Sequence, residues 1–282
     1  MVGADARAGR TNRGREDRNA TSGSIFVSGP LGTQPGTAAR QARMQLEADL
    51  ESLPGLAGRL TGAMLDRIET YVALLLAANQ RLNLTRVTQP QAVARQHLLD
   101  ALAVLPQLDD LASPRAVDLG SGGGVPSIPV AIARPDLSWL LVDSVAKKAR
   151  ALAAFVEELG LRGVEVVAER AEVLGRDPRH RERAGLVTAR AVATLPVLAE
   201  LALPLLLPGG VLIAWKGPMA AHDEELQRGA RAAAQLGGGP PELLAAGPPQ
   251  LGGHRFVRVP KRARTPARYP RRPGEPARRP LG

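Results

Sequence analysis

The sequence predicts an α/β fold in which a small helical cap precedes a mostly parallel sheet. Two patterns along its 282 residues support this prediction. From Met44 to about Leu108, apolar residues recur every three or four positions, as on one face of a helix. From Arg115 onward, short apolar runs alternate with helical stretches, which is typical of parallel strands joined by crossover helices. We therefore assign a helical cap to residues 44–112 and a sheet domain to residues 113–262.

The sheet domain contains five apolar runs that we predict to be parallel strands. These runs are Ala116–Leu119, Trp139–Asp143, Val164–Ala168, Leu186–Ala189 and Val211–Trp215. The predicted crossover helices are Ile128–Ala133, Val145–Leu159 and Leu195–Leu206. Phe256–Val259 is predicted to pair antiparallel at an edge of the sheet, and residues 237–253, which are rich in Gly and Pro, are predicted to form a loop.

Both ends of the chain carry its excess positive charge. Residues 1–43 contain 7 Arg and 3 acidic residues, and residues 254–282 contain 10 Lys or Arg and one Glu. The part between them has 20 basic and 23 acidic residues, so the net charge of +10 comes from the ends and indicates a polyanionic partner. Residues 1–43 are interpreted as a disordered basic arm or an over-long gene start, and residues 263–282 as a basic Pro/Arg-rich tail.

Composition excludes several kinds of chemistry. The chain has no cysteine, which removes disulfides, thiolate nucleophiles and cysteine-ligated metals. Its four histidines share no metal-ligand spacing, so no metal is expected. No apolar run reaches the roughly 20 residues needed to span a bilayer, and the N-terminus lacks the apolar segment of a secretory signal. We therefore expect a cytoplasmic protein that is not inserted in a membrane.

A glycine-rich loop over residues 117–124 is the most informative segment. It follows a predicted strand and opens into a helix, where glycines let the backbone turn sharply and approach a ligand. Gly120 and Gly122 begin an alternating run of glycines, and Asp118 precedes it by two positions. Val125 stands where a dinucleotide fingerprint requires its third glycine. This pattern favours a loop that binds S-adenosylmethionine over the loop of a nicotinamide-dependent oxidoreductase.

Acidic residues follow the next two predicted strands. Asp143 ends the second strand, where a carboxylate can accept both ribose hydroxyls of a bound adenosine. The alternative role is a cap for the helix that follows, but the position one strand–helix unit after the glycine loop favours the ribose. Residues 169–172 follow the third strand at the level where an adenine ring would lie, although such a charged cluster is often only a solvated loop.

In these residues and in the motifs given below, the chain resembles the glucose-inhibited division protein B family, which methylates N7 of one guanine in small-subunit (16S) ribosomal RNA. The resemblance extends from about Tyr71 to the C-terminus. The motifs that carry it, in order, are Asn83-Leu84-Thr85, His97–Leu102, Asp118–Pro126, Leu141–Ser144 with Lys147-Lys148, Arg170–Glu172, Ala189–Ala191, Lys216-Gly217 and Tyr269–Gly274. The sequence departs from the family pattern at Gln96, Ser127 and Val192.

The resemblance implies a Rossmann-like class I methyltransferase with a seven-strand-type sheet and S-adenosyl-L-methionine as cofactor. The implied cofactor contacts, to which we add Gly122 and Asp143 from the arguments above, are Gly120, Val125, Ala171, Glu172 and Arg190. The residues that we expect to contact RNA are His97, Lys147, Lys216, Arg271 and Arg272. In the basic C-terminal stretch, Lys261, Arg262, Arg264 and Arg268 are further candidates for binding phosphate. His97 is also interpreted as an interior contact between the cap and the sheet domain.

The implied reaction needs no catalytic proton carrier. Guanine N7 already has a free lone pair, so no general base is expected and catalysis should rest on positioning. Absence of cysteine excludes the covalent route to pyrimidine C5, and the sequence has no Asn/Asp-Pro-Pro-aromatic tetrad to hold an exocyclic amine. We expect a monomer that acts on 16S rRNA or the small ribosomal subunit. A methyltransferase of a small molecule and an inactive rRNA-binding relative are the alternatives.

Overall fold

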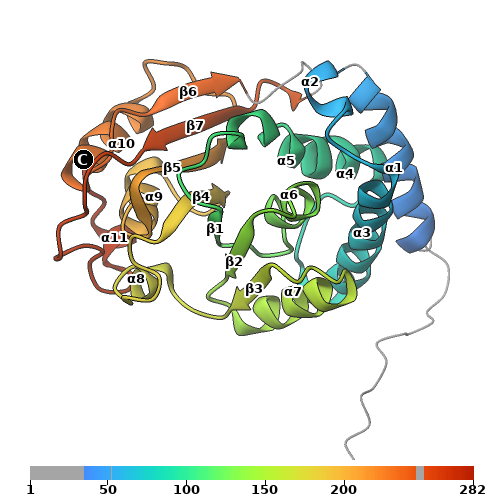
Figure 1. The fold of residues 1–282 in the computed structure, drawn as a ribbon, viewed down its shortest axis with the longest axis horizontal. Coiled ribbons are helices and arrows are strands. Elements are labelled where there is room, and N and C mark those ends of the chain that lie inside the picture. Colours follow the sequence, from blue (N-terminus) through green and yellow to red (C-terminus); the bar gives the residue numbers. More distant parts are fainter. Residues whose placement is uncertain (1–34, 52, 246–250) are drawn as a thin grey trace, which may run out of the picture. The chain divides into compact units, whose positions relative to one another are not determined.

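A mixed sheet lies at the centre of the computed structural model, which describes residues 35–51, 53–245 and 251–282 (Figure 1). Within these residues the sheet has seven strands in the order β3-β2-β1-β4-β5-β7-β6. The strands are β1 (Arg115–Leu119), β2 (Ser138–Val142), β3 (Val164–Val167), β4 (Ala184–Arg190), β5 (Leu206–Lys216), β6 (Glu242–Ala245) and β7 (Arg255–Pro260). β1 to β5 pair in parallel, and this confirms the predicted α/β fold with a mostly parallel sheet.

The last two strands correct the prediction for the C-terminal part of the sheet. β7 is antiparallel, as predicted for Phe256–Val259, but it lies between β5 and β6 and not at an edge. The edge is occupied by β6, which forms inside the predicted loop 237–253. β6 is four residues long and only half-buried, so it lacks the long apolar run that marks a central strand. Residues 246–250 of the predicted loop lie outside the described residues.

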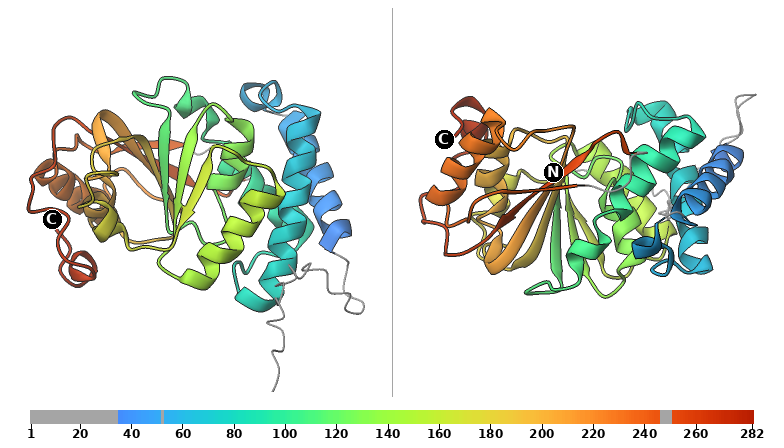
Figure 2. Two further views of the ribbon diagram at one scale, coloured as in Figure 1. Left: turned by 60° about the horizontal axis from the view of Figure 1, so that its bottom comes forward. Right: turned by 90° about the horizontal axis from the view of Figure 1, so that it is seen from above.

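Helices cover both faces of the sheet (Figure 2). The helices before β1 are α1 (Pro35–Glu51), α2 (Pro54–Ala57), α3 (Gly62–Leu82), α4 (Pro90–Val93), the π-helix η1 (Ala94–Leu99), α5 (Asp100–Leu102) and the 3₁₀ helix η2 (Leu105–Leu108). Those after β1 are α6 (Ser127–Ala133), α7 (Ala146–Glu158), α8 (Ala171–Leu174), α9 (Leu195–Ala202), α10 (Glu224–Gln235) and α11 (Glu275–Arg278). One core joins α1, α3, α6 and α7 to the sheet, and a second joins α9 and α10 to its other face. Parallel strands that are buried on both faces read as continuous apolar runs, which made β1, β2, β4 and β5 predictable, whereas β3 lies at the edge and is only partly buried.

The N-terminal helix begins earlier than predicted. α1 starts at Pro35, so residues 35–43, which were assigned to the disordered arm, are helical. Ala39 and Ala42 are fully buried there, and the Arg43 guanidinium pairs with Asp66 and Glu69 on α3. The apolar face of residues 35–43 is made of alanines, so this part of the sequence lacks the pattern of large apolar residues that predicts a buried helix. The predicted arm over residues 1–34 lies outside the described residues.

The predicted cap shares a core with the sheet domain. Tyr71 on α3 is fully buried, and its hydroxyl donates a hydrogen bond of 2.9 Å to the carbonyl of Gly123 in the glycine-rich loop. The described residues all belong to one compact unit. The change of pattern near residue 112 therefore separates helices from strands within that unit.

The predicted basic tail packs on the domain over much of its length. Tyr269 and Pro276 are buried, and the Arg181 guanidinium donates to the carbonyls of Thr265 and Tyr269. Lys261, a predicted phosphate contact just before the tail, is only 2% exposed. Its ammonium donates to Thr265 Oγ1 and to the carbonyls of Leu203 and Leu236, which end α9 and α10. That prediction is therefore wrong, because Lys261 closes two helix ends, and burial lowers its pKa to about 8.

Candidate active site

The glycine-rich loop leaves β1 at the carboxyl edge of the parallel strands. Gly120, Gly122 and Gly124 have φ angles of +69°, +54° and +92°, a region that side chains with a Cβ rarely adopt. A Cβ on Gly120 would lie 2.7 Å from Cγ2 of Val192, which follows β4. The backbone at Gly120 therefore has to stay bare, as a loop that approaches a ligand closely requires.

Hydrogen bonds fix this loop to the neighbouring strand. The N–H groups of Gly120 and Ser121 both donate to the carbonyl of Val142, at 2.8 and 3.0 Å. The Ser121 hydroxyl donates to the carbonyl of Asp118 at 3.0 Å and accepts from the Val142 N–H at 3.1 Å. These hydrogen bonds hold the loop between β1 and β2.

Asp118 lies beneath the loop and is fully buried. The Thr188 hydroxyl donates to its Oδ1 at 2.7 Å, while Oδ2 has no hydrogen-bond partner among the described residues. Burial raises the pKa of Asp118 from 3.8 to about 6, and the nearby charge of Asp143 acts in the same direction. Asp118 supports the loop from inside the domain.

Asp118→Asn is expected to make stability less sensitive to pH. In the unfolded chain Asp118 ionises near pH 4, whereas in the folded protein it stays protonated until about pH 6, so the wild type loses stability as the pH rises through this window. The free energy of unfolding of the variant minus that of the wild type should therefore increase between pH 4 and pH 7. Chemical denaturation at several pH values measures it, with Asp110→Asn at an exposed position as the control.

Comparing variant with wild type at each pH is necessary because His97 acts in the opposite direction. Burial lowers its pKa from 6.5 to about 4, so between these values the unfolded chain binds a proton that the folded protein does not, and stability falls as the pH drops from about 6.5 to 4. His97 is present in both proteins and cancels in the difference. A difference that stays constant from pH 4 to pH 7 would contradict the raised pKa of Asp118.

Asp143 follows β2 and binds the same loop. Its Oδ2 accepts from the Gly122 N–H at 2.9 Å, and its Oδ1 accepts from the Val145 N–H at 2.8 Å, just before α7. Val145 is the N-cap residue of α7 and this helix has no side-chain cap, so the capping role that the sequence left open for Asp143 is not observed. The predicted contact with a ribose stays a prediction, since each carboxylate oxygen can accept more than one hydrogen bond.

Ala171 and Glu172 begin α8, after β3. Glu172 is buried, and its carboxylate accepts from the Arg170 guanidinium at 2.8 and 3.2 Å and from the Gly274 N–H at 2.8 Å. Burial alone would raise the pKa of Glu172, but Arg170 and the Gly274 N–H hold it below its usual value. No motif in the sequence indicated the link to Gly274, which brings the C-terminal segment to the predicted cofactor edge.

Arg190 ends β4 and holds the cap against the sheet. Its guanidinium donates to the carbonyl of Gln96 at 2.6 Å and lies 3.2 Å from Oδ2 of Asp100, which is fully buried. Asp100 Oδ1 lies 3.0 Å from Nδ1 of His254, and its carbonyl accepts from the Trp215 indole N–H at 2.9 Å. Asp100 was noted only as part of a motif, yet it joins three elements beside a predicted cofactor residue.

His97 lies inside the protein, next to this cluster. Its Nε2 is 2.7 Å from the Thr85 hydroxyl oxygen, and burial, followed by the charge of Arg190, lowers its pKa. This position matches the interior contact between cap and sheet domain. In this conformation the imidazole is not accessible to an RNA phosphate, which corrects the prediction of an RNA contact at His97.

The other four predicted RNA contacts differ in whether their charged groups already have hydrogen-bond or ion-pair partners. The Lys216 ammonium binds the Ala193 carbonyl at 3.0 Å and Glu225 at 2.6 Å, and the Arg271 guanidinium pairs with buried Glu200. Lys147 and Arg272 are exposed and have no ion-pair partner within the described part of the chain. RNA binding by these four residues stays a prediction, and Lys147 and Arg272 are the cations that need no rearrangement.

Three exposed valines surround the carboxyl edge. Val145, Val173 and Val192 follow β2, β3 and β4 and are 40%, 41% and 37% exposed. Val173 lies in α8, and the strands that precede Val145 and Val192 are separated by β1. Exposed apolar side chains at this edge suit the binding of a ligand with apolar surface. The sequence analysis noted Val192 only as a departure from the family, because exposure cannot be read from a single residue type. We call these residues the valine rim.

The described residues contain no group of three or more His, Cys, Asp or Glu side chains placed to hold a metal ion. A helix long and apolar enough to cross a membrane is not found among them either.

The strand order, the bare glycine loop after β1 and the carboxylate after β2 define a class I methyltransferase with a Rossmann-like fold. Residues 64–239 match the family model of GidB, described as rRNA small subunit methyltransferase G, and the chain belongs to this family. The family resemblance stated from the sequence is thereby confirmed.

Relatives in this family match most of the chain. The protein of Deinococcus deserti named ribosomal RNA small subunit methyltransferase G is 45% identical over 219 residues, which cover 77% of this chain and 89% of the relative. Proteins of the same name from Rubrobacter xylanophilus and Leuconostoc mesenteroides are 42% and 39% identical, and the alignments cover 86% and 84% of this chain and 92% and 100% of the relatives. The matched residues include the carboxyl-edge site from Gly120 to Arg190.

Proposed function

We propose that this methyltransferase transfers a methyl group from S-adenosylmethionine to N7 of one guanine in 16S ribosomal RNA of the small subunit. The observation that carries the proposal is the family match over residues 64–239, which contains every loop of the carboxyl-edge site. The name of the relatives supports small-subunit rRNA as the substrate. The choice of N7 rests on the family resemblance.

The residues at the carboxyl edge fit this cofactor. Gly120 and Gly122 leave backbone uncovered, and Asp143 can accept from ribose hydroxyls beside it. Val125, Ala171, Glu172 and Arg190 complete the proposed cofactor contacts. The valine rim supplies apolar surface for flat rings and helps to exclude water. When bound, the cofactor supplies a methyl group on a positively charged sulfur.

The chain's part in the reaction is to position the base. The N7 lone pair of guanine forms the new bond to the methyl carbon while the bond from that carbon to sulfur breaks, and the positive charge passes to the guanine. No proton leaves, so no side chain has to act as a base. Rigid placement of two reactants can lower a barrier by roughly 7–11 kcal/mol, and the loop hydrogen bonds at Val142 and Asp143 are suited to this.

Exposed cations near the site are proposed to contact the RNA. Lys147 lies at the start of α7, directly after the cofactor edge, and Arg272 lies on the C-terminal segment that reaches Glu172 through Gly274. Both can neutralise phosphates without breaking an existing ion pair. We propose that the protein acts as a monomer in the cytoplasm.

Transfer of a labelled methyl group tests the proposed function. The purified protein is incubated with methyl-labelled S-adenosylmethionine and small subunits, or their rRNA, from a strain that lacks the enzyme. We expect the label as 7-methylguanosine at one position, located by nucleoside mass spectrometry. Cofactor binding without transfer to either substrate would contradict the assignment and favour a small-molecule methyltransferase or an inactive rRNA-binding relative.

A further inference from the structure

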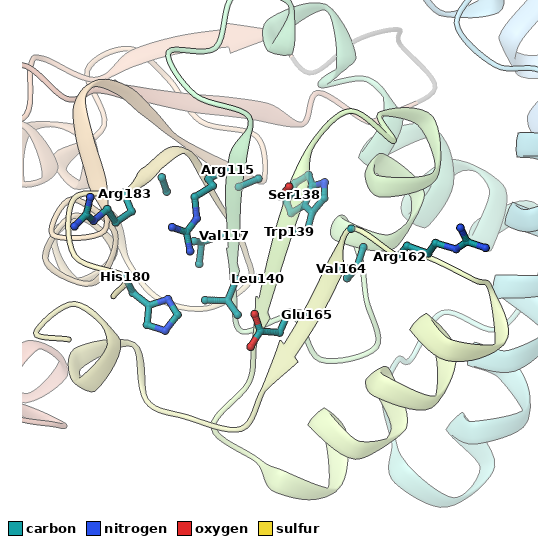
Figure 3. A pocket seen from close by; sticks show the side chains of 13 residues that line it. Arg115, Val117, Ser138, Trp139, Leu140, Arg162, Val164, Glu165, His180 and Arg183 are labelled. Carbon is teal, nitrogen blue, oxygen red and sulfur yellow. The ribbon is translucent and has the colours of Figure 1, made fainter. Parts of the chain in front are cut away.

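A cavity of about 280 Å³ lies at the amino ends of β1, β2 and β3, opposite the cofactor edge (Figure 3). The first residues of these strands, Arg115, Ser138 and Val164, line it. Arg162 before β3 and Arg183 before β4 add two further positive charges to the lining. We call this feature the amino-edge cavity.

The absence of a long helix explains why the cavity exists. The segment between β3 and β4 forms only the four-residue helix α8, whereas the 13-residue α7 lies between β2 and β3 and packs on the opposite face. Val117 and Leu140 form an apolar floor where a longer helix would otherwise pack. The amino-edge cavity is therefore bounded by strand residues as well as by exposed side chains.

Three unpaired arginines surround the amino-edge cavity. Arg115, Arg162 and Arg183 are exposed, and none of their guanidinium groups has a hydrogen-bond or ion-pair partner within the described part of the chain. Glu165 is the carboxylate among the lining residues, and His180 adds a further nitrogen donor or acceptor. With His180 neutral, the lining carries a net charge of +2, which favours an anionic ligand.

The arrangement of the arginines suits several anionic groups in a row. Figure 3 shows Arg115, His180 and Arg183 on one side of β2, and Arg162 beyond β3 on the other side. Successive phosphates of a nucleic-acid strand could contact guanidinium groups on both sides of β2. Arginine also binds phosphate with paired N–H donors, and with 2% aromatic residues the chain has few side chains on which bases could stack.

We infer that the amino-edge cavity binds the phosphodiester backbone of the ribosomal RNA substrate, at a contact remote from the methyl-transfer site. This inference rests on the proposed function, because it takes the same rRNA as the ligand. The contact would raise affinity and orient the substrate without touching the target guanine. None of the residues invoked belongs to the proposed cofactor site.

RNA binding at several salt concentrations, by a variant that lacks two of the cavity arginines, tests the inference. The double variant Arg115→Gln/Arg183→Gln is compared with Arg67→Gln/Arg231→Gln, which removes the same charge from exposed positions on α3 and α10. The probe is a small-subunit rRNA transcript, titrated at several salt concentrations. The cavity variant should bind on the order of tenfold more weakly in 0.1 M salt, and its log–log salt slope should fall by about 1.5, since each lost phosphate contact removes about 0.7–0.9. The control variant Arg67→Gln/Arg231→Gln should show a smaller change in both its rRNA affinity and its salt slope.

Unchanged melting temperature and cofactor affinity would show that the cavity variant is folded. Equal losses in both variants would overturn the inference, because net charge alone would then explain them. The inference would also be overturned if the cavity variant lost binding to free guanosine monophosphate but kept its rRNA affinity. The cavity would then be assigned to a mononucleotide. Failure of the proposed function is a separate result: the unaltered protein would transfer no methyl group, whatever the RNA affinities are.

Discussion

Gly120→Ala is expected to weaken S-adenosylmethionine binding by about tenfold or more, which corresponds to about 1.4 kcal/mol. The new Cβ would lie 2.7 Å from Val192 Cγ2, so the loop or the valine rim has to move where the cofactor is proposed to bind. The left-handed φ of +69° adds roughly 1–2 kcal/mol of backbone strain for any residue with a Cβ. Calorimetric titration with the cofactor and thermal unfolding measure the two effects separately.

Gly160→Ala is the matched control for this variant. Gly160 has a similar φ of +62°, but a Cβ there would meet nothing within 4 Å. It should therefore lose only the stability that the backbone strain costs, and keep its cofactor affinity. Gly120→Ala/Val192→Ala should recover part of the lost affinity, because Val192→Ala removes the atom that clashes. If Gly120→Ala binds the cofactor as well as Gly160→Ala does, the bare backbone at Gly120 is not part of the cofactor site.

β1, β2, β4 and β5 could be predicted because most of their residues are buried, which leaves largely apolar runs in the sequence. β3 is a partly exposed edge strand, and Glu165 interrupts its apolar run. β6 and the first turns of α1 lack that pattern, since β6 is a short edge strand and α1 buries small alanines such as Ala39 and Ala42. The glycine loop was predicted from its spacing because few backbones other than a tight strand-to-helix turn need so many adjacent glycines.

The connections between distant parts of the site could not be predicted in the same way. Glu172 accepts from Gly274, 102 positions later, and Asp100 contacts His254 at a separation of 154 positions. Both contacts depend on how the C-terminal strands and the segment after them fold back, and no local pattern records this. A positive charge in the sequence likewise does not say whether the residue is exposed, as Arg272 is, or closes helix ends, as Lys261 does.

Arg271→Met is expected to lower the free energy of unfolding by roughly 3–5 kcal/mol, the range found when one partner of a buried ion pair is removed. Its guanidinium donates to both carboxylate oxygens of Glu200, at 2.5 to 3.1 Å, and Glu200 is 0% exposed. The variant would leave this carboxylate without its counter-charge beneath the C-terminal segment. Denaturant titration measures the loss, and limited proteolysis reports whether residues 269–282 detach.

Arg272→Met separates this structural role from RNA binding. Arg272 is adjacent and exposed, so its replacement should change stability by less than about 0.5 kcal/mol while it weakens rRNA binding. Arg271→Met/Glu200→Met should regain much of the stability that Arg271→Met loses, because apolar residues can replace a buried ion pair at little cost. If Arg271→Met is as stable as Arg272→Met, the pair with Glu200 does not anchor the C-terminal segment. Arg271 would then return to the group of exposed cations, with Lys147 and Arg272, whose expected role is contact with the RNA backbone.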